Sequence, residues 1–301
     1  MMIKDQTLFS IVVVSYNSED TIIETLNSAK SQSYSPLELI IADDGSSDNT
    51  VEKCKEWLKI NGDRFESSQI ITSEINKGTS ANCNRALYAA NGKWIKYLGA
   101  DDTLMPNCIK DFSFYILQNP SCKWIASVAE EYWDTFDEYN KINTDSFYNR
   151  TKPLFDLSFT EQLHKMVREV FIIAPSQIYE KDLLLSVGGF DEKYRLLEDA
   201  PMHIKLLEKG VRCFFLDKST IRYRRKKKSS NSLFNQTLIE DQKKVFDDLR
   251  QKYLTRREKK EFLLCYSLRK KICSSGHNKP SAYNKAIYSI GRILSKIISY
   301  F

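Results

Sequence analysis

The sequence predicts an α/β protein built on a mixed, mainly parallel sheet that is flanked by helices. Short β-branched runs alternate with amphipathic helical stretches over the first hundred residues, and this alternation is typical of βαβ units. The chain of 301 residues, 42% of them apolar and 28% charged, is long enough for one large core and an appendage.

Four strands and three helices are expected in the first hundred residues. Each strand is a short apolar run, and each helix has apolar residues on one face. In chain order they are the strand Ser10–Ser15, a helix from Asp20, its N-cap, to Gln32, the strand Leu37–Ala42, a helix from Asn49 or Thr50 to Ile60, the strand Gln69–Thr72, the helix Thr79–Asn91 and the strand Trp94–Leu98.

The remainder of the chain has fewer clear signals. Residues 120–180 are rich in aromatic and acidic residues without a clear period, and Gly188 and Gly189 mark a turn. The later patterns are a helix from Glu198 to Gly210, further strands over 211–223 and a highly charged helix over 237–266.

Polar clusters follow three of the expected strands. They are Ser15–Ser18, Asp43–Ser47 and the pair Asp101 and Asp102. Ligands of parallel α/β sheets bind at the carboxyl ends of the strands. The clusters therefore predict a binding site at this edge of the sheet.

Two of the clusters contain adjacent carboxylates, which repel each other. At Asp43 and Asp44 a carboxylate can accept hydrogen bonds from a ribose hydroxyl or a base N–H; the alternative is a turn that caps the next helix. At Asp101 and Asp102 a divalent cation would relieve the repulsion, since Mg²⁺ and Mn²⁺ prefer hard oxygen ligands. The alternative there is a polar loop with a helix N-cap before Met105.

A third acidic pair, Glu198 and Asp199, opens the helix that ends at Gly210. Attack by a hydroxyl group needs a general base within hydrogen-bond reach, and a carboxylate at a helix N-terminus beside the site can serve. The alternative is an acidic first turn that complements the helix dipole.

Six motifs stand in a fixed order along residues 9–210. They are V-V-V-S-Y-N, A-D-D-G-S-S-D-N-T, N-K-G-T-S-A-N-C-N, Y-L-G-A-D-D, G-G-F-D-E and L-E-D. In this order they strongly resemble glycosyltransferase family 2, whose members have the Rossmann-like GT-A fold. The resemblance implies an inverting transfer of a sugar from a nucleoside diphosphate donor to a hydroxyl group, usually with a divalent metal, Mn²⁺ or Mg²⁺.

The resemblance also implies a role for each matched residue. The implied base is Asp199, supported by Glu198, and the implied metal ligand is Asp102 or Asp101. The implied donor-binding residues are Val14, Ser15, Tyr16, Asn17, Asp43, Asp44, Lys77, Gly78 and Asp101. UDP is the expected nucleotide by family habit, and no residue identifies the donor sugar.

The chain departs from the family pattern at three places. Many relatives have Asp where Gly99 stands, which leaves two carboxylates for a metal, and many have Arg where Cys83 stands. Many also have a His after a Tyr-Arg pair, whereas Tyr223 and Arg224 precede a basic run over 225–228. Our hypothesis is that this run folds over the diphosphate and neutralises it directly.

The uneven distribution of charge predicts two regions with different tasks. The net charge is +6, but residues 220–301 hold 21 Lys and Arg against 6 Asp and Glu. We expect a GT-A catalytic domain over 1–225 and a basic helical region over 226–301. Its last segment, 282–301, has the pattern of a basic amphipathic helix that lies in a membrane interface; the alternative is a helix packed on its own domain.

The cysteines and the N-terminus predict a cytoplasmic protein. The seven Cys show no C-x-x-C spacing, and residues 1–9 lack the apolar stretch of a signal peptide. We expect a peripheral enzyme on the inner face of the cytoplasmic membrane. Its expected acceptor is a glycan, in particular one linked to undecaprenyl diphosphate, as in bacterial relatives that build O-antigen or capsule polysaccharides.

Other function classes fit the residues less well. A nucleotidyltransferase needs a glycine- and arginine-rich loop after the first strand, and residues 15–20 contain no Gly. The sequence has no P-loop motif and no nucleic-acid-binding motif beside the basic tail, so no nucleic acid partner is expected. The remaining alternative is a catalytically silent nucleotide-sugar-binding subunit, although such a subunit has no need of both Asp102 and Asp199.

Overall fold

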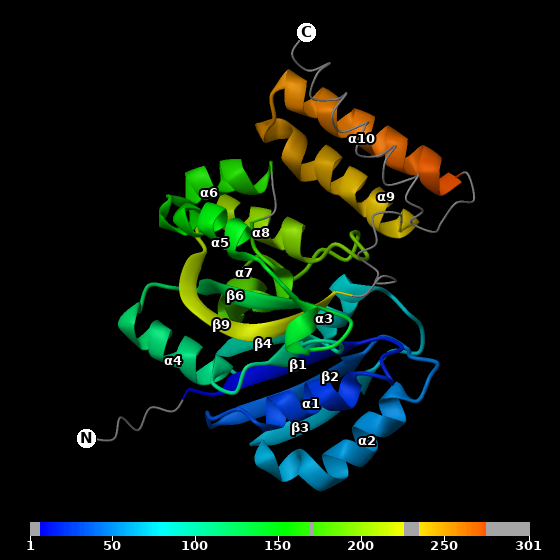
Figure 1. The fold of residues 1–301 in the computed structure, drawn as a ribbon, viewed down its shortest axis with the longest axis vertical. Coiled ribbons are helices and arrows are strands. Elements are labelled where there is room, and N and C mark those ends of the chain that lie inside the picture. Colours follow the sequence, from blue (N-terminus) through cyan, green and yellow to red (C-terminus); the bar gives the residue numbers. More distant parts are fainter. Residues whose placement is uncertain (1–6, 169–170, 226–234, 275–301) are drawn as a thin grey trace.

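The computed structural model describes residues 7–168, 171–225 and 235–274, and this part of the chain has the predicted α/β architecture (Figure 1). The strand order is β3-β2-β1-β4-β8-β6-β9-β5, and β7 pairs with β6. The strands are β1 Phe9–Ser15, β2 Leu37–Asp43, β3 Ser67–Thr72, β4 Trp94–Gly99, β5 Thr103–Leu104, β6 Trp124–Trp133, β7 Lys141–Ile142, β8 Gln177–Glu180 and β9 Phe214–Arg225.

The sheet is parallel over its first half and mixed over its second. β1 pairs parallel with β2 and β4, and β2 pairs parallel with β3. β8 joins this half to β6 through two antiparallel pairings, and β6 runs parallel to β9. The carboxyl ends of β1, β2 and β4 therefore lie at one edge, as predicted from the polar clusters.

Helices cover both faces of the sheet. They are α1 Ile22–Lys30, α2 Thr50–Asn61, α3 Thr79–Ala89, α4 Cys108–Gln118, α5 Asp145–Thr151, α6 Phe159–Met166, α7 Lys181–Ser186, α8 Asp199–Glu208, α9 Gln236–Val245 and α10 Arg256–Ser274. The last two lie together at the end of the molecule opposite α2, next to α6 and α8 (Figure 1).

Alternate residues of β1 face two separate cores. Ile11 and Val13 pack in a cluster with residues of α1, α2 and α4, whereas Val12 packs in a second cluster with residues of α3, α6 and α8. All three side chains are fully buried. Burial on both faces explains why the parallel strands are continuous apolar runs rather than alternating ones.

The expected ends of the first and third helices differ from the structure, and the first helix also ends at Lys30 rather than Gln32. The first helix begins at Ile22 with Thr21 as N-cap, because the amides of Thr21 and Ile22 both bond to the carbonyl of Ser18 and the chain turns there before the helix starts. The third helix ends at Ala89 rather than Asn91. The reason is tertiary: the backbone and side-chain N–H groups of Asn91 both donate to the carboxylate of Glu38, at 2.7 Å each.

The charged segment predicted as one helix over 237–266 forms two. α9 ends at Val245, a π-turn and a 3₁₀ turn cover 246–253, and α10 begins at Arg256. Thr255 and Glu258 form reciprocal side-chain bonds that cap α10. Residues 211–223, expected to form several strands, lie mainly in the single long strand β9.

The division of the chain at residue 225 stays a prediction. The described part of the second region packs on the first, since Val245 of α9 belongs to the same buried cluster as Met166 and Val167. The predicted amphipathic helix over 282–301 lies outside the described residues. In the described ranges, no helix combines the length and apolar character needed to span a bilayer.

Candidate active site

A cavity of about 560 Å³ lies at the carboxyl ends of β1, β2 and β4, where the polar clusters predicted a site. Ten of the residues predicted for the site line it: Val14, Ser15, Tyr16, Asn17, Asp44, Gly78, Asp101, Asp102, Glu198 and Asp199. Asp43 and Lys77 do not line it, but each forms a hydrogen bond with a residue that does. The cavity thus brings together segments from both halves of the chain.

The turn after β1 is held in shape by the turn after β2. Asn17 adopts a left-handed backbone conformation with φ of 48°, and its amide donates to Oγ of Ser46 at 2.8 Å. Asp43, fully buried, accepts from Oγ of Ser15 at 2.8 Å and from the amide of Ser46 at 2.8 Å. Asp43 is therefore a support of the cavity wall, and Tyr16, 48% exposed, presents its ring at the opening.

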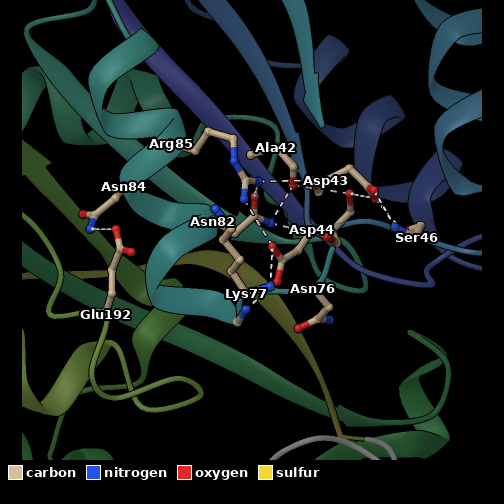
Figure 2. Close-up of polar contacts among 12 residues, drawn as sticks. Ala42, Asp43, Asp44, Ser46, Asn76, Lys77, Asn82, Asn84, Arg85 and Glu192 are labelled. Atoms are coloured by element: carbon tan, nitrogen blue, oxygen red, sulfur yellow. Dashed lines mark hydrogen bonds and ion pairs between the residues drawn. The ribbon is translucent and has the colours of Figure 1, made fainter. Parts of the chain in front are cut away.

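Asp44 joins the end of β2 to the loop before α3 (Figure 2). Its carboxylate accepts from the amides of Lys77 at 3.1 Å and Gly78 at 2.6 Å, and from the guanidinium of Arg85 at 3.2 Å. The side chain of Lys77 is exposed. At Gly78, with φ of 99°, an added Cβ would lie 2.2 Å from Cγ of Arg195, so only glycine fits here.

Asp101 and Asp102 converge on Gly99. A Cβ built on Gly99 would lie 3.1 Å from Oδ1 of Asp101 and 3.2 Å from Oδ2 of Asp102. Asp102 is 2% exposed; burial, and then the charge of Asp101, raise the pKa of its carboxyl well above the usual range. The alternative of a helix cap is wrong, because Thr103 and Leu104 form β5 and α4 begins at Cys108.

Arg224, which the sequence did not single out for the site, holds this acidic loop from the end of β9. Its amide donates to Oδ1 of Asp102 at 2.8 Å, and its Nε donates to the carbonyl of Asp101 at 2.7 Å. Its two Nη groups bond to the carbonyl of Asp134 and the carboxylate of Glu24. Arg224 therefore ties β4, α1 and the end of β6 together at the cavity wall.

The basic run over 225–228, which we expected to cover the diphosphate, starts with a residue that has a protein partner. Arg225 is paired with Glu131 of β6, Nε to Oε2 at 2.5 Å. Residues 226–228 lie outside the described residues, so the hypothesis about them stays a prediction.

Glu198 and Asp199 line the cavity together at the start of α8. Burial raises the pKa of Glu198, and the charge of Asp199 raises it further. Burial also raises the pKa of Asp199, but the amide of Ala200 donates to its Oδ1 at 2.7 Å and opposes the shift. A backbone hydrogen bond also opposes the shift at Glu198, so the pKa of both carboxyls is raised mainly by burial and the two titrate as a pair.

The profile of the family described as glycosyl transferase family 2 matches residues 10–184. This is more than half of the chain. The chain belongs to glycosyl transferase family 2. The match begins at β1 and ends in α7, so it includes the ends of β1, β2 and β4 at the cavity.

Several curated relatives of this family 2 chain are named for sugar transfer or for teichoic acid biosynthesis. Two from Escherichia coli are named UDP-Glc:alpha-D-GlcNAc-diphosphoundecaprenol beta-1,3-glucosyltransferase. One is 37% identical over 117 residues, 38% of this chain and 43% of the relative. The other is 41% identical over 97 residues, which are 32% of this chain and 36% of that relative. A minor teichoic acid biosynthesis protein from Bacillus subtilis is 25% identical over 229 residues, which are 74% of this chain and 48% of that relative. Each match spans less than half of the relative's length.

Solved structures confirm the GT-A fold of this family 2 chain. TarS from S. aureus in complex with UDP-GlcNAc has a TM-score of 0.59 at 18% identity, over 94% of this chain and 79% of that one. The mannosyltransferase PcManGT from Pyrobaculum calidifontis, in complex with GDP-Man and Mn²⁺, has a TM-score of 0.62 at 16% identity, over 97% and 81%.

A metal site in this family 2 chain would be small. In the ranges that the structure describes, no three His, Cys, Asp or Glu side chains form a metal-binding group. Two convergent carboxylates, Asp101 and Asp102, nevertheless suit Mg²⁺ or Mn²⁺, since Mg²⁺ is commonly held by one or two carboxylates, substrate phosphates and water. Their residue types and convergence beside Gly99 fit such a cation.

Part of the cavity wall comes from β8, a strand that the sequence did not reveal. Gln177 and Tyr179 both line the cavity, and the Tyr179 hydroxyl donates to Oε1 of Gln177 at 2.9 Å. Behind them, buried Lys96 donates to the carbonyls of Pro175 and Gln177, and burial lowers the pKa of its ammonium to about 8. The lone sequence signal was a Lys inside an otherwise apolar strand.

Proposed function

We propose that this chain is an inverting glycosyltransferase that moves a sugar from a UDP-linked donor to a hydroxyl of a lipid-linked glycan. The observation that carries the proposal is a single cavity in which the Ser15–Asn17 turn, Asp44, the acidic pair 101–102 and the pair 198–199 meet. It thus combines candidate nucleoside, diphosphate and base positions in one cavity. Membership of family 2 supports the reaction type.

In the proposed reaction, Asp199 accepts the proton of the acceptor hydroxyl. The hydroxyl oxygen forms a bond to the anomeric carbon of the sugar as the bond between that carbon and the diphosphate oxygen breaks, so UDP leaves with the bonding electrons. Attack opposite the leaving group inverts the anomeric configuration. A protonated Glu198, which its burial favours, would keep a second negative charge away from the base.

Asp101 and Asp102 would hold the divalent cation, which in this chemistry neutralises charge on a leaving diphosphate. The ring of Tyr16 offers a flat surface for the base, and Asp44 still has lone pairs for a base N–H or a ribose hydroxyl after its three protein bonds. Both E. coli relatives are named for UDP-Glc as donor and GlcNAc-diphosphoundecaprenol as acceptor, which supports testing this pair first.

We further propose that the enzyme works at the cytoplasmic face of the membrane and contacts it through residues 282–301. The pattern of apolar and basic residues in that segment and the lipid-linked acceptor of the relatives support this. In liposome flotation, we expect the full chain to float and an Ile290→Asp, Leu294→Asp variant to remain at the bottom. Equal flotation of the two proteins would refute the membrane role of this segment.

The test of the reaction is a screen of UDP-sugars with Mn²⁺ and a synthetic GlcNAc-diphospho-lipid. We expect turnover with one donor, inversion at the anomeric carbon by NMR, and a loss of about 10²–10⁴-fold in kcat for Asp199→Asn. Glu208→Gln, at the other end of α8, is the matched control and should keep normal turnover. Donor binding without turnover under every condition would favour the silent-subunit alternative.

A further inference from the structure

The segment that carries the base has little regular structure of its own. Residues 190–198, here called the base loop, run from Phe190 to Glu198 and contain no helix or strand. Asp199, the first residue of α8, follows directly. Inside it, the amide of Tyr194 donates to the carbonyl of Asp191 at 3.0 Å. Since a loop with so little regular structure takes much of its shape from its neighbours, the position of the base depends on what the base loop contacts.

One side of the base loop is bound to the donor half of the cavity. The Asn84 side chain of α3 accepts from the amide of Phe190 at 2.8 Å and donates to Oε1 of Glu192 at 2.9 Å, the latter contact being drawn in Figure 2. Oγ of Ser80 donates to the carbonyl of Tyr194. The guanidinium of Arg195 donates to the carbonyl and side chain of Asn76, at 2.9 and 2.8 Å.

The other side of the base loop is bound to the C-terminal helices. Oδ2 of Asp241, in α9, accepts from the amide of Leu196 at 2.7 Å. Asp248, just beyond α9, accepts from the hydroxyl of Tyr194 at 3.0 Å. Leu196 itself lines the cavity. A segment outside the predicted catalytic domain therefore contacts the loop three residues before the base.

Asp241 is an unusual residue for a surface appendage. Its residue exposure is 0%, and its second oxygen contacts the ammonium of Lys244 at 3.4 Å. A buried carboxylate is unfavourable unless it is hydrogen-bonded. The bond from the Leu196 amide therefore holds the two partners together, because its loss would leave Oδ2 of the buried Asp241 without this donor.

We propose that Asp241 is a positioning residue for the reaction, and that α9 is part of the active site rather than an appendage. By fixing the Leu196 amide, Asp241 sets the path of the base loop and, through it, the place of Asp199 opposite the donor. This inference rests on the proposed function, in which Asp199 is the base. A displacement of the base by about 1 Å is enough to reduce turnover by about 10²-fold, so a single anchoring bond can matter.

The test compares three variants of the full chain. Asp241→Ala removes the acceptor, Asp241→Asn keeps an acceptor oxygen without the charge, and Asp247→Ala is the matched control. Asp247 pairs with Lys243 one turn earlier, and its side chain is 45% exposed. The readouts are kcat, the donor KM, UDP affinity by calorimetry and hydrogen exchange at the Leu196 amide.

We expect Asp241→Ala to lower kcat by about tenfold or more, with the donor KM and UDP affinity within about twofold of normal. Exchange at the Leu196 amide should accelerate in the same variant. Asp241→Asn should recover most of kcat and of the protection, and Asp247→Ala should change neither. Normal kcat in Asp241→Ala, or equal losses of kcat and UDP affinity, would overturn the proposal.

A double-mutant cycle separates positioning of the base from a general structural role. If Asp241 acts through Asp199, Asp241→Ala should add no further loss of kcat to the residual turnover of Asp199→Asn. An additional tenfold loss would show that it acts elsewhere and overturn the proposal. If Asp241→Ala does not fold, Tyr194→Phe removes only the hydroxyl bonded to Asp248 and should lower kcat with an unchanged donor KM; an unchanged kcat would count against the proposal.

Failure of the two proposals can be told apart. An unmodified chain that turns over no donor refutes the proposed function, and the role of Asp241 toward the base falls with it. An unmodified chain that turns over normally, with an Asp241→Ala variant of equal kcat, refutes only the positioning role.

Discussion

The sharpest stability prediction concerns Arg224, whose guanidinium joins three distant segments. Arg224→Ala would remove the donors of the Asp101 and Asp134 carbonyls and the ion pair with Glu24. It would also remove the contact with the Phe136 ring, whose centroid lies 4.1 Å from Cζ of Arg224. The amide bond from Arg224 to Asp102 does not involve the side chain and would remain.

The expected loss of unfolding free energy follows from the groups that lose a partner in Arg224→Ala. Loss of the donor to the Asp101 carbonyl costs about 1–3 kcal/mol, whereas Asp134 is exposed, so water replaces the donor to its carbonyl; the cation–ring contact contributes about 0.5–2 kcal/mol. The Glu24 side chain is 51% exposed, so water replaces its lost partner at little cost. We therefore expect Arg224→Ala to lower the free energy of unfolding by about 3–4 kcal/mol, and Arg224→Lys, with no planar fork, by about half as much.

Urea denaturation followed by tryptophan fluorescence measures this change. Lys218→Ala is the matched control, because Lys218 lies on the same strand in an exposed ion pair with Asp111 and should change stability by less than about 0.5 kcal/mol. Arg224→Ala should also reduce turnover, since Asp101 loses its backbone anchor. An Arg224→Ala protein within about 0.5 kcal/mol of the unmodified chain would refute the reasoning.

Three further predictions test single buried groups. The raised folded-state pKa of Glu198 means that it binds its proton more tightly when folded, so its stabilising contribution is complete at acid pH and is lost as the pH rises above the unfolded value. Urea titrations should therefore show a stability advantage of Glu198→Gln that grows from about pH 5 to about pH 9; a constant difference would contradict this. Lys96→Met leaves the carbonyls of Pro175 and Gln177 unpaired and should lower the unfolding free energy by about 2–5 kcal/mol, and a loss below about 1 kcal/mol would speak against those bonds. Asp102→Asn should weaken Mn²⁺ binding in the presence of UDP by about tenfold or more, measured by electron paramagnetic resonance; an unchanged affinity would exclude Asp102 as a ligand.

The parts of the fold that could be predicted are those with local causes. β1, β2 and β4 are short apolar runs followed by polar turns, and in a parallel sheet those turns must meet at one edge. The start of α10 also had a local signal, because Thr255 and Glu258 have capping-box spacing, but the charged pattern around them was interpreted as one helix.

Long-range partners account for most of what the sequence did not reveal. Arg224 looked like one member of a basic run, yet it bonds to Asp102, 122 positions away, and to Glu24, 200 positions away. The family resemblance predicts Asp43 and Asp44 as donor-binding residues, and that role stays a prediction. The structure shows that Asp43 supports the turn behind the cavity and that Asp44 anchors the loop at Gly78.

The sequence by itself determined the α/β class, the order of the first strands and helices, and the edge of the sheet at which the acidic residues gather. These features depend on side-chain periodicity and turn chemistry within a few residues, so they can be recognised in the sequence. Only the tertiary structure decided that β8 and β9 complete the cavity and that Asp241 of α9 holds the base loop. Those contacts depend on which buried donor meets which buried acceptor after packing. Because the partners lie far apart in the chain, no local sequence pattern predicts them.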